Sequence, residues 1–175
     1  MDSSNLKHQL AEIVKTKQEA EYLKNDIQKL ASALFNTKAN ITHEIDTYIP
    51  FDKKEQFLSL FGQNQITFQD LENTQKFLAL ITETLNDIPV ISLQIAIEPK
   101  QETIDTISDW FSQRLNKEVL LDIVVKKELL AGCVIINNGI FRDYSIKKKI
   151  EDRFNNVDSV PLDANQNIRH DTNIS

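Results

Sequence analysis

The chain has 175 residues and a formal net charge of -6, from 20 lysine and arginine residues against 26 aspartate and glutamate residues. This length fits one domain of ordinary size, or a helical arm followed by one small domain. The acidic balance argues against a nucleic-acid-binding protein, which normally presents a basic face to phosphates. No apolar run is long enough to span a bilayer, and the N-terminus lacks the apolar core of a secretory signal.

The first stretch, residues 4–49, contains no proline or glycine and carries apolar residues at mixed spacings of three and four. This heptad-like stripe predicts an amphipathic arm that packs along a single partner. Two arrangements are open: one continuous helix of roughly 65 Å, or a hairpin split at the weak helix formers Asn36, Thr37 and Asn40. The partner is either the rest of the chain or another subunit. The stripe consists of Leu6, Leu10, Ile13, Ala20, Leu23, Ile27, Leu30, Leu34, Ile41, Ile45 and Tyr48.

Two short helices are predicted over residues 52–88, after the arm. Pro50 ends the arm, because the residue before a proline is disfavoured in the helical conformation. Asp52 and Glu55 have the spacing of a capping box, which predicts the start of the first short helix. Together with the arm, these segments make residues 1–88 a helical region.

From Val90 onward the apolar period changes from helical to alternating. This alternation predicts a half-buried strand that Pro99 closes. Helical spacing returns over residues 101–116, and a second apolar strand follows over residues 119–125. A strand, a helix and a strand in this order predict a right-handed crossover between parallel strands.

A hairpin is predicted next, because Asn138-Gly139 separates two apolar runs, residues 134–136 and 140–143. A type I′ turn needs positive φ at both central residues, which asparagine and glycine tolerate best. Ser145 can then cap a final helix. The apolar face of that helix consists of Ile146, Ile150 and Phe154.

The predicted fold class is therefore α+β. It has a long N-terminal helix or helical hairpin and short helices, followed by a small mixed β-sheet with flanking helices on one side. Residues 89–154 form the small α/β domain. The polar residues 155–175 are predicted to be a disordered tail.

The sequence contains no common catalytic or metal-binding motif: no glycine-rich phosphate loop, no cysteine pair at metal spacing and no HExxH. Its histidines, His8, His43 and His170, are far apart, so neighbours in sequence cannot form a catalytic pair. Cys133 is the one cysteine and lies in an apolar run, where a buried thiol is expected rather than a reactive one. We therefore expect no catalytic residues, cofactor or metal, and an enzyme with an unrecognised site is only a third alternative.

Residues 130–154 read LAGCVIINNGIFRDYSIKKKIEDRF. They combine a small residue and a glycine, an apolar strand, a turn with glycine, and then an aspartate, one residue, a serine, an aliphatic and a basic residue. This order resembles the C-terminal signature of the delta subunit (oligomycin-sensitivity-conferring type) of F-type ATP synthases, and the resemblance covers about residues 88–154. It implies structural or interface roles for Ala131, Gly132, Asp143, Ser145 and Lys147.

The resemblance implies a non-catalytic peripheral-stalk, or stator, subunit that links the catalytic head of an F-type ATP synthase to its membrane-anchored stalk. The implied partners are the b-type stalk subunit and the alpha and beta subunits of the head, with no nucleic acid and no direct membrane insertion. The implied location is the cytoplasmic side of the cell membrane, where partner subunits would hold the protein. Whether the synthase runs on protons or sodium is left open.

The family normally begins with a six-helix bundle that grips the alpha subunits. Here the arm is expected in its place, and residues 52–88 are expected to match only the last helices of the bundle. The alternative to a stator subunit is a coiled-coil adaptor or a homodimeric scaffold protein unrelated to ATP synthase.

Overall fold

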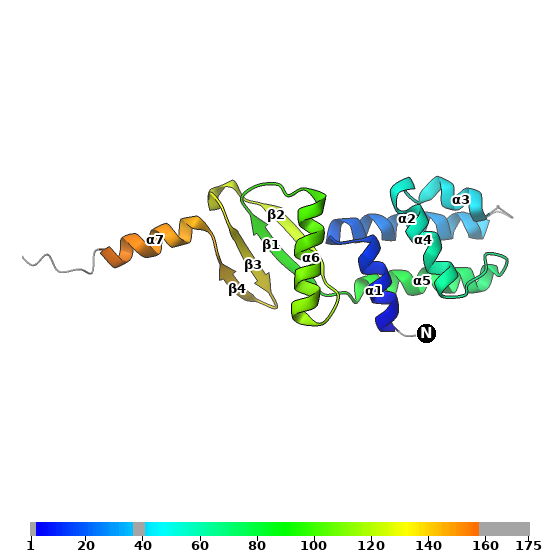
Figure 1. The fold of residues 1–175 in the computed structure, drawn as a ribbon. Coiled ribbons are helices and arrows are strands. Elements are labelled where there is room, and N and C mark those ends of the chain that lie inside the picture. The colour runs from blue at the N-terminus through cyan, green and yellow to red at the C-terminus, as the bar shows by residue number, and fades with distance from the viewer. Residues whose placement is uncertain (1–2, 37–40, 158–175) are drawn as a thin grey trace, which may run out of the picture.

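The computed structural model describes residues 3–36 and 41–157. A helical bundle lies at one end, a four-stranded sheet lies next to it, and the last helix projects from the other end (Figure 1). The bundle contains α1 (Ser3–Ile13), α2 (Lys17–Asn36), α3 (Ile41–Tyr48), α4 (Phe51–Gln63) and α5 (Leu71–Asn86). The second part contains β1 (Val90–Ile95), α6 (Gln101–Leu115), β2 (Leu120–Val125), η1 (Lys127–Leu129), β3 (Cys133–Asn137), β4 (Ile140–Asp143) and α7 (Ile146–Val157). This is the predicted α+β class.

The apolar stripe of the N-terminal stretch is buried inside the chain itself. Its members share one core with side chains of α4 and α5, so the partner of the arm is the rest of the chain. The arm therefore does not replace a bundle, as the sequence suggested, but forms one with residues 52–88. The buried stripe members are Leu6, Leu10, Ile13, Ala20, Leu23, Ile27, Leu30, Leu34 and Ile45, and their partners include Phe57, Phe61, Phe77, Ile81 and Leu85.

A continuous helix over residues 4–49 is excluded by a break at residues 14–16. The backbone amides of Lys15 and Thr16 donate to Glu19 Oε2 at 2.9 and 3.0 Å. The amide of Glu19 donates back to Thr16 Oγ1 at 3.1 Å. This reciprocal capping box ends α1 and starts α2. The chain divides again between α2 and α3, as the hairpin arrangement expected, although residues 37–40 lie outside the described part.

The start of α4 differs from the predicted one. α4 begins at Phe51, directly after Pro50, and no side chain caps it, so the capping box predicted at Asp52 is wrong. Pro50 takes the N-cap position, and its carbonyl accepts from the Lys53 amide at 3.1 Å, so the helix starts at Phe51. α5 begins after Asp70, whose carboxylate accepts from the Asn73 amide at 3.0 Å.

The sheet has the strand order β2-β1-β3-β4. β1 and β2 are parallel and are joined through α6, whereas β1 pairs with β3 and β3 with β4 in antiparallel fashion. The crossover and the hairpin are therefore both as predicted. At the hairpin, Asn138 has φ of 48° and Gly139 has φ of 77°, as a type I′ turn requires.

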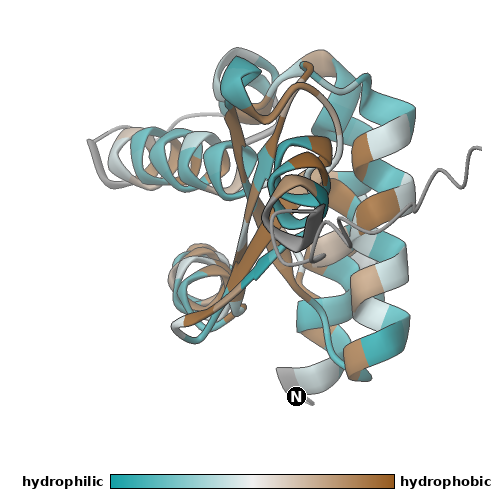
Figure 2. Cartoon of the chain, turned by 90° about the vertical axis from the view of Figure 1, so that its left-hand side faces the viewer, coloured by the Kyte–Doolittle hydropathy of each residue, from teal (hydrophilic) through white to brown (hydrophobic). Residues whose placement is uncertain are grey.

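α6 covers one face of the sheet, where Phe111 packs against Ile91 and Leu121. The strands are largely hydrophobic along their length (Figure 2). α7 does not flank the sheet, because it leaves the end of β4 and projects away from the strands (Figure 1). It ends at Val157, and residues 158–175, most of the predicted tail, lie outside the described part.

The sheet is joined directly to the bundle through the beginning of β2. Leu120 is 2% exposed and belongs to the core of the bundle. The amide of the next residue, Leu121, donates to the Lys15 carbonyl at 3.0 Å, and Thr16 forms a parallel bridge with Leu121. The segment between α1 and α2 therefore extends the β2 edge of the sheet by one short pairing.

Candidate functional site

Four of the five motif residues meet where β4 runs into α7. The Ala131 carbonyl accepts from the Ile146 amide at 2.9 Å. Gly132 has φ of 86°, and a Cβ at this position would collide with the Tyr144 carbonyl oxygen and lie 3.0 Å from the Ser145 Cα. A glycine is needed here because it tolerates positive φ and allows the two backbones to approach closely. Ala131 and Gly132 therefore hold the first turn of α7 against the loop before β3.

Asp143 and Ser145 organise the N-terminus of α7. Ser145 is 1% exposed, and its hydroxyl oxygen accepts from the Lys148 amide at 3.2 Å as an N-cap. The Ser145 amide in turn donates to Asp143 Oδ1 at 2.8 Å. The hydroxyl and the amide of Ser145 together lower the pKa of Asp143 below its ordinary value. The carboxylate therefore stays ionised near the positive end of the helix dipole, where it is favourable.

Lys147 does not join this junction. Its ammonium lies 4.0 Å from Glu151 Oε1 on the surface of α7, and about half of each side chain is exposed. Such an exposed pair contributes little to stability. The motif is thus a structural junction of four residues, and Lys147 belongs to the surface of the helix that the junction orients.

The junction presents an apolar surface at the end of the molecule far from the bundle. On α7, Ile146, Ile150 and Phe154 are 45%, 42% and 70% exposed, and we call these three residues the α7 stripe. On the neighbouring edge strand β4, Ile140 and Phe141 are 61% and 59% exposed. An exposed apolar stripe along a helix, such as the α7 stripe, is typical of a protein interaction surface.

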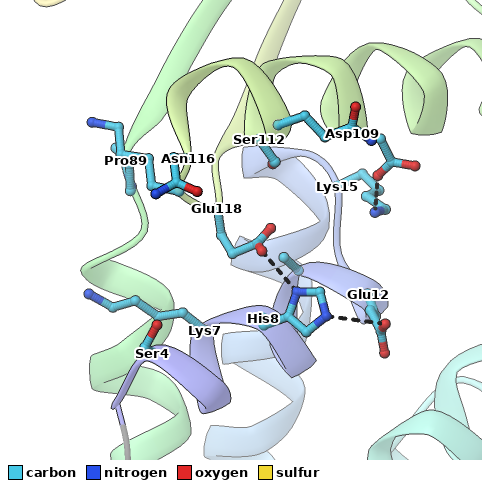
Figure 3. A pocket seen from close by; sticks show the side chains of 13 residues that line it. Ser4, Lys7, His8, Glu12, Lys15, Pro89, Asp109, Ser112, Asn116 and Glu118 are labelled. Carbon is cyan, nitrogen blue, oxygen red and sulfur yellow. Dashed lines mark hydrogen bonds and ion pairs between the residues drawn. The ribbon is translucent and has the colours of Figure 1, made fainter.

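A polar groove with a volume of about 770 Å³ lies between α1 and the end of α6 (Figure 3). His8 Nδ1 lies 2.9 Å from Glu118 Oε1, and His8 Nε2 lies 3.7 Å from Glu12 Oε1. Lys15 and Asp109 pair at 2.9 Å across the same groove. The hydrogen bond with Glu118 raises the pKa of His8. Sequence reasoning missed this contact because Glu118 is 110 positions away from His8 and no local signal links them.

Acidic and basic side chains lie in pairs in this groove, His8 with Glu118 and Lys15 with Asp109. Among the described residues, no group of three or more His, Cys, Asp and Glu side chains is placed to hold a metal ion. Cys133, expected to be buried, is partly exposed in β3, and burial together with Asp143 raises its pKa. His43 is exposed, and His170 lies outside the described part. None of the described helices is long and apolar enough to cross a bilayer.

Comparison with known proteins identifies the C-terminal region. No curated protein matches the chain. Residues 75–156, from within α5 through the last turn of α7, match the family model of the ATP synthase delta (OSCP) subunit. The resemblance stated from the sequence is therefore confirmed for this region: residues 75–156 are similar to the ATP synthase delta (OSCP) subunit family, and this similarity supports a subunit of the ATP synthase peripheral stalk.

Proposed function

We propose that this protein is a non-catalytic stator subunit that links the catalytic head of an F-type ATP synthase to its membrane-anchored stalk. The observation that carries the proposal is the family match over residues 75–156. The matched region begins within the bundle and includes the sheet, the motif junction and nearly all of α7. A linking subunit needs a stable shape and extended contact surfaces, and it needs no reactive group.

The arrangement of the chain supports this role. The bundle and α7 lie at opposite ends of the molecule, so two partners can bind without competing for one surface (Figure 1). In our proposal, the bundle contacts the alpha and beta subunits of the head. The α7 stripe and the exposed edge strand β4 contact the b-type stalk subunit. These partners would hold the protein at the cytoplasmic side of the cell membrane.

Co-purification tests the proposal directly. The full chain, tagged at its N-terminus and produced in its native cells, is expected to recover the alpha, beta and b-type subunits. The variant Ile150→Asp places a charge in the middle of the α7 stripe and is expected to lose the b-type subunit while keeping the head subunits. The matched control is Thr106→Asp on the exposed surface of α6, which is expected to behave like the unchanged protein.

Recovery of the chain alone, or as a homodimer without synthase subunits, would contradict the proposal and favour a scaffold protein. The coiled-coil form of that alternative relied on the apolar stripe of residues 4–49. Most of that stripe is occupied by the core of the bundle.

A further inference from the structure

The charged side chains of α7 lie in three rows along the helix, and only two of these rows contain ion pairs among the described residues. At 3.6 residues per turn, side chains four positions apart lie one above the other. The row that follows the α7 stripe contains Lys147 and Glu151, which lie 4.0 Å apart. The row on the opposite side of the helix contains Lys148 and Asp152, which pair at 3.0 Å. Both rows are therefore neutral by themselves.

The remaining row, Lys149 and Arg153, is purely cationic and borders the α7 stripe. Lys149 directly precedes Ile150, and Arg153 directly precedes Phe154. Both cations are exposed, and neither forms an ion pair with any residue that the structure describes. Like charges four positions apart on a helix repel each other. We call Lys149 and Arg153 the cationic border.

The position of the lysines along the helix adds to this imbalance. Lys147, Lys148 and Lys149 lie in the first turn of α7, which contains no acidic residue. The N-terminal end of a helix carries a partial positive charge, so cations there are unfavourable. Asp143 and Ser145 compensate only at the cap itself. The α7 stripe is thus exposed to solvent, and the cations beside it lack an ion-pair partner among the described residues. Both lie on the same side of α7.

We infer that the α7 stripe binds an amphipathic helix that carries acidic residues along the edge of its apolar seam. This inference rests on the proposed function and adds the chemistry of the stalk helix that this surface accepts. When the stripe is covered, Lys149 and Arg153 lie at the rim of the contact, within reach of carboxylates on the partner. Rim charges of this kind set partner choice and association rate more than the final affinity. Because the other rows are neutral, the cationic border alone sets the charge preference.

A second copy of this chain fits the surface less well than an acidic helix. In a symmetric antiparallel pair of α7 helices, each flank of one helix meets the same flank of the other. The cationic border would then face its own copy, and the two would repel each other. Charge complementarity therefore favours a partner of opposite charge over self-association.

The test uses two synthetic helical peptides with the same leucine seam, one with glutamate and one with lysine along both edges of the seam. Binding of each peptide to the full chain is measured by fluorescence anisotropy at low and high salt. We expect at least tenfold tighter binding of the glutamate peptide at low salt, and a smaller difference at high salt because salt screens exposed charges. The double variant Lys149→Glu, Arg153→Glu is expected to reverse the preference. A matched pair of single variants, Lys149→Glu and Lys148→Glu, separates the cationic border from the opposite face, and only the first is expected to weaken binding of the glutamate peptide.

Equal binding of the two peptides, binding of neither, or an unchanged preference in the double variant would overturn the inference. Should the double variant lose its helical circular dichroism, Lys149→Gln with Arg153→Gln replaces it, and the preference is expected to disappear. Concentration-dependent dimerisation that competes with the glutamate peptide would instead assign the stripe to a second copy. A chain that recovers the synthase subunits but shows no charge preference overturns this inference alone. A chain that prefers the glutamate peptide but recovers no synthase subunit overturns the proposed function alone.

Discussion

The backbone before β3 is tightly constrained at the scale of single residues. Leu130 has φ of 63° and ψ of -53°, and the Ala131 amide donates to the Leu129 carbonyl at 2.7 Å across it. This is a γ-turn of the rare type with positive φ, which is strained for a residue with a side chain. Gly132, two residues later, also has positive φ. These two residues, separated by Ala131, direct the chain beneath the start of α7.

Gly132→Ala is expected to destabilise the protein by about 2–4 kcal/mol, because it combines positive φ with a collision at the Tyr144 carbonyl. Urea unfolding of both variants measures the difference. The control is Gly139→Ala in the hairpin turn, where φ is also positive but no atom lies within 4 Å of the added Cβ. That variant is expected to cost only about 1 kcal/mol. Equal losses in the two variants would show that the close approach at Gly132 is unimportant.

At the scale of secondary-structure elements, the stability of α7 depends on its N-cap residue, Ser145. The helix has few contacts with the rest of the chain beyond the junction and η1. Its own sequence is unfavourable at the N-terminus, because the first turn is basic. The cap provided by Ser145 and the anchoring bond from Ile146 to Ala131 therefore decide whether α7 stays formed.

Ser145→Ala is expected to cost about 1 kcal/mol and to increase fraying of α7, because the Lys148 amide loses its acceptor. Hydrogen exchange of the amides in the first turn of α7 gives the local readout, and exchange is expected to accelerate there while the bundle is unaffected. Ser145→Thr retains an acceptor oxygen and serves as the conservative control. Unchanged exchange in Ser145→Ala would mean that the hydroxyl does not stabilise the helix.

The elements differ in how far the sequence could predict them. The sheet was predictable because its signals are local: alternating strands, a helix of crossover length and the dipeptide Asn138-Gly139. The first bundle helices were not, because the periodicity of the apolar residues runs through the break at residues 14–16. Thr16 and Glu19 have the spacing of a capping box and lie at that break. Asp52 and Glu55 have the same spacing, but the structure shows no capping box there. The spacing of a capping box therefore predicts a helix start reliably only when the conformation of the neighbouring backbone is known.

The candidate site likewise contains some residues that the sequence could predict and others that it could not. Ala131, Gly132, Asp143 and Ser145 could be singled out by their order in sequence, and they come together in the fold. The exposure of the α7 stripe was not predictable, because an amphipathic helix normally buries its apolar face. The groove around His8 joins residues that are distant in sequence, and no pattern in either segment indicates the other.

At the scale of the whole molecule, the bundle and the sheet share a core through Leu120. This residue begins β2 but packs among the bundle side chains, next to the pairing of Leu121 with Thr16. The two parts are therefore expected to unfold together rather than as independent units.

Leu120→Ala is expected to lower the free energy of unfolding by about 2–5 kcal/mol, because it leaves a cavity at the joint. The loss is expected to appear with the same midpoint in two probes: helical circular dichroism, which reports mainly the bundle, and the fluorescence of Trp110 on α6. Val124→Ala on the same strand is the control, and since Val124 is 43% exposed, a loss below about 1 kcal/mol is expected. Separate midpoints in the unchanged protein would contradict a shared core.

A pH dependence follows from the groove that also spans this joint. Because the hydrogen bond with Glu118 raises the pKa of His8 in the folded state, the charged pair stabilises the protein below the ordinary histidine pKa of 6.5. This contribution is lost as the pH rises through the raised pKa. The effect is expected to be small because most of the His8 side chain is exposed, and it is screened by salt. Melting temperatures of the unchanged protein and of His8→Gln at pH 6 and pH 9 measure it.

The unchanged protein is expected to lose more stability than His8→Gln between these two pH values. The other charged groups around His8 are present in both proteins, so the comparison isolates the loss of the His8 side chain; they are Lys7, Glu12, Lys15, Asp109 and Lys117. Parallel pH profiles would show that the contact between His8 and Glu118 does not stabilise the joint.

The contact of Lys15 and Thr16 with Leu121 also has a consequence for biosynthesis. The ribosome adds roughly 5–20 residues per second, so several seconds separate the emergence of the first helices from that of β2. Until β2 emerges, Leu120 is missing from the core of the bundle, and the nascent bundle exposes part of its apolar core. The early helices must therefore be shielded or remain loosely collapsed on the ribosome until the middle of the chain arrives to close them.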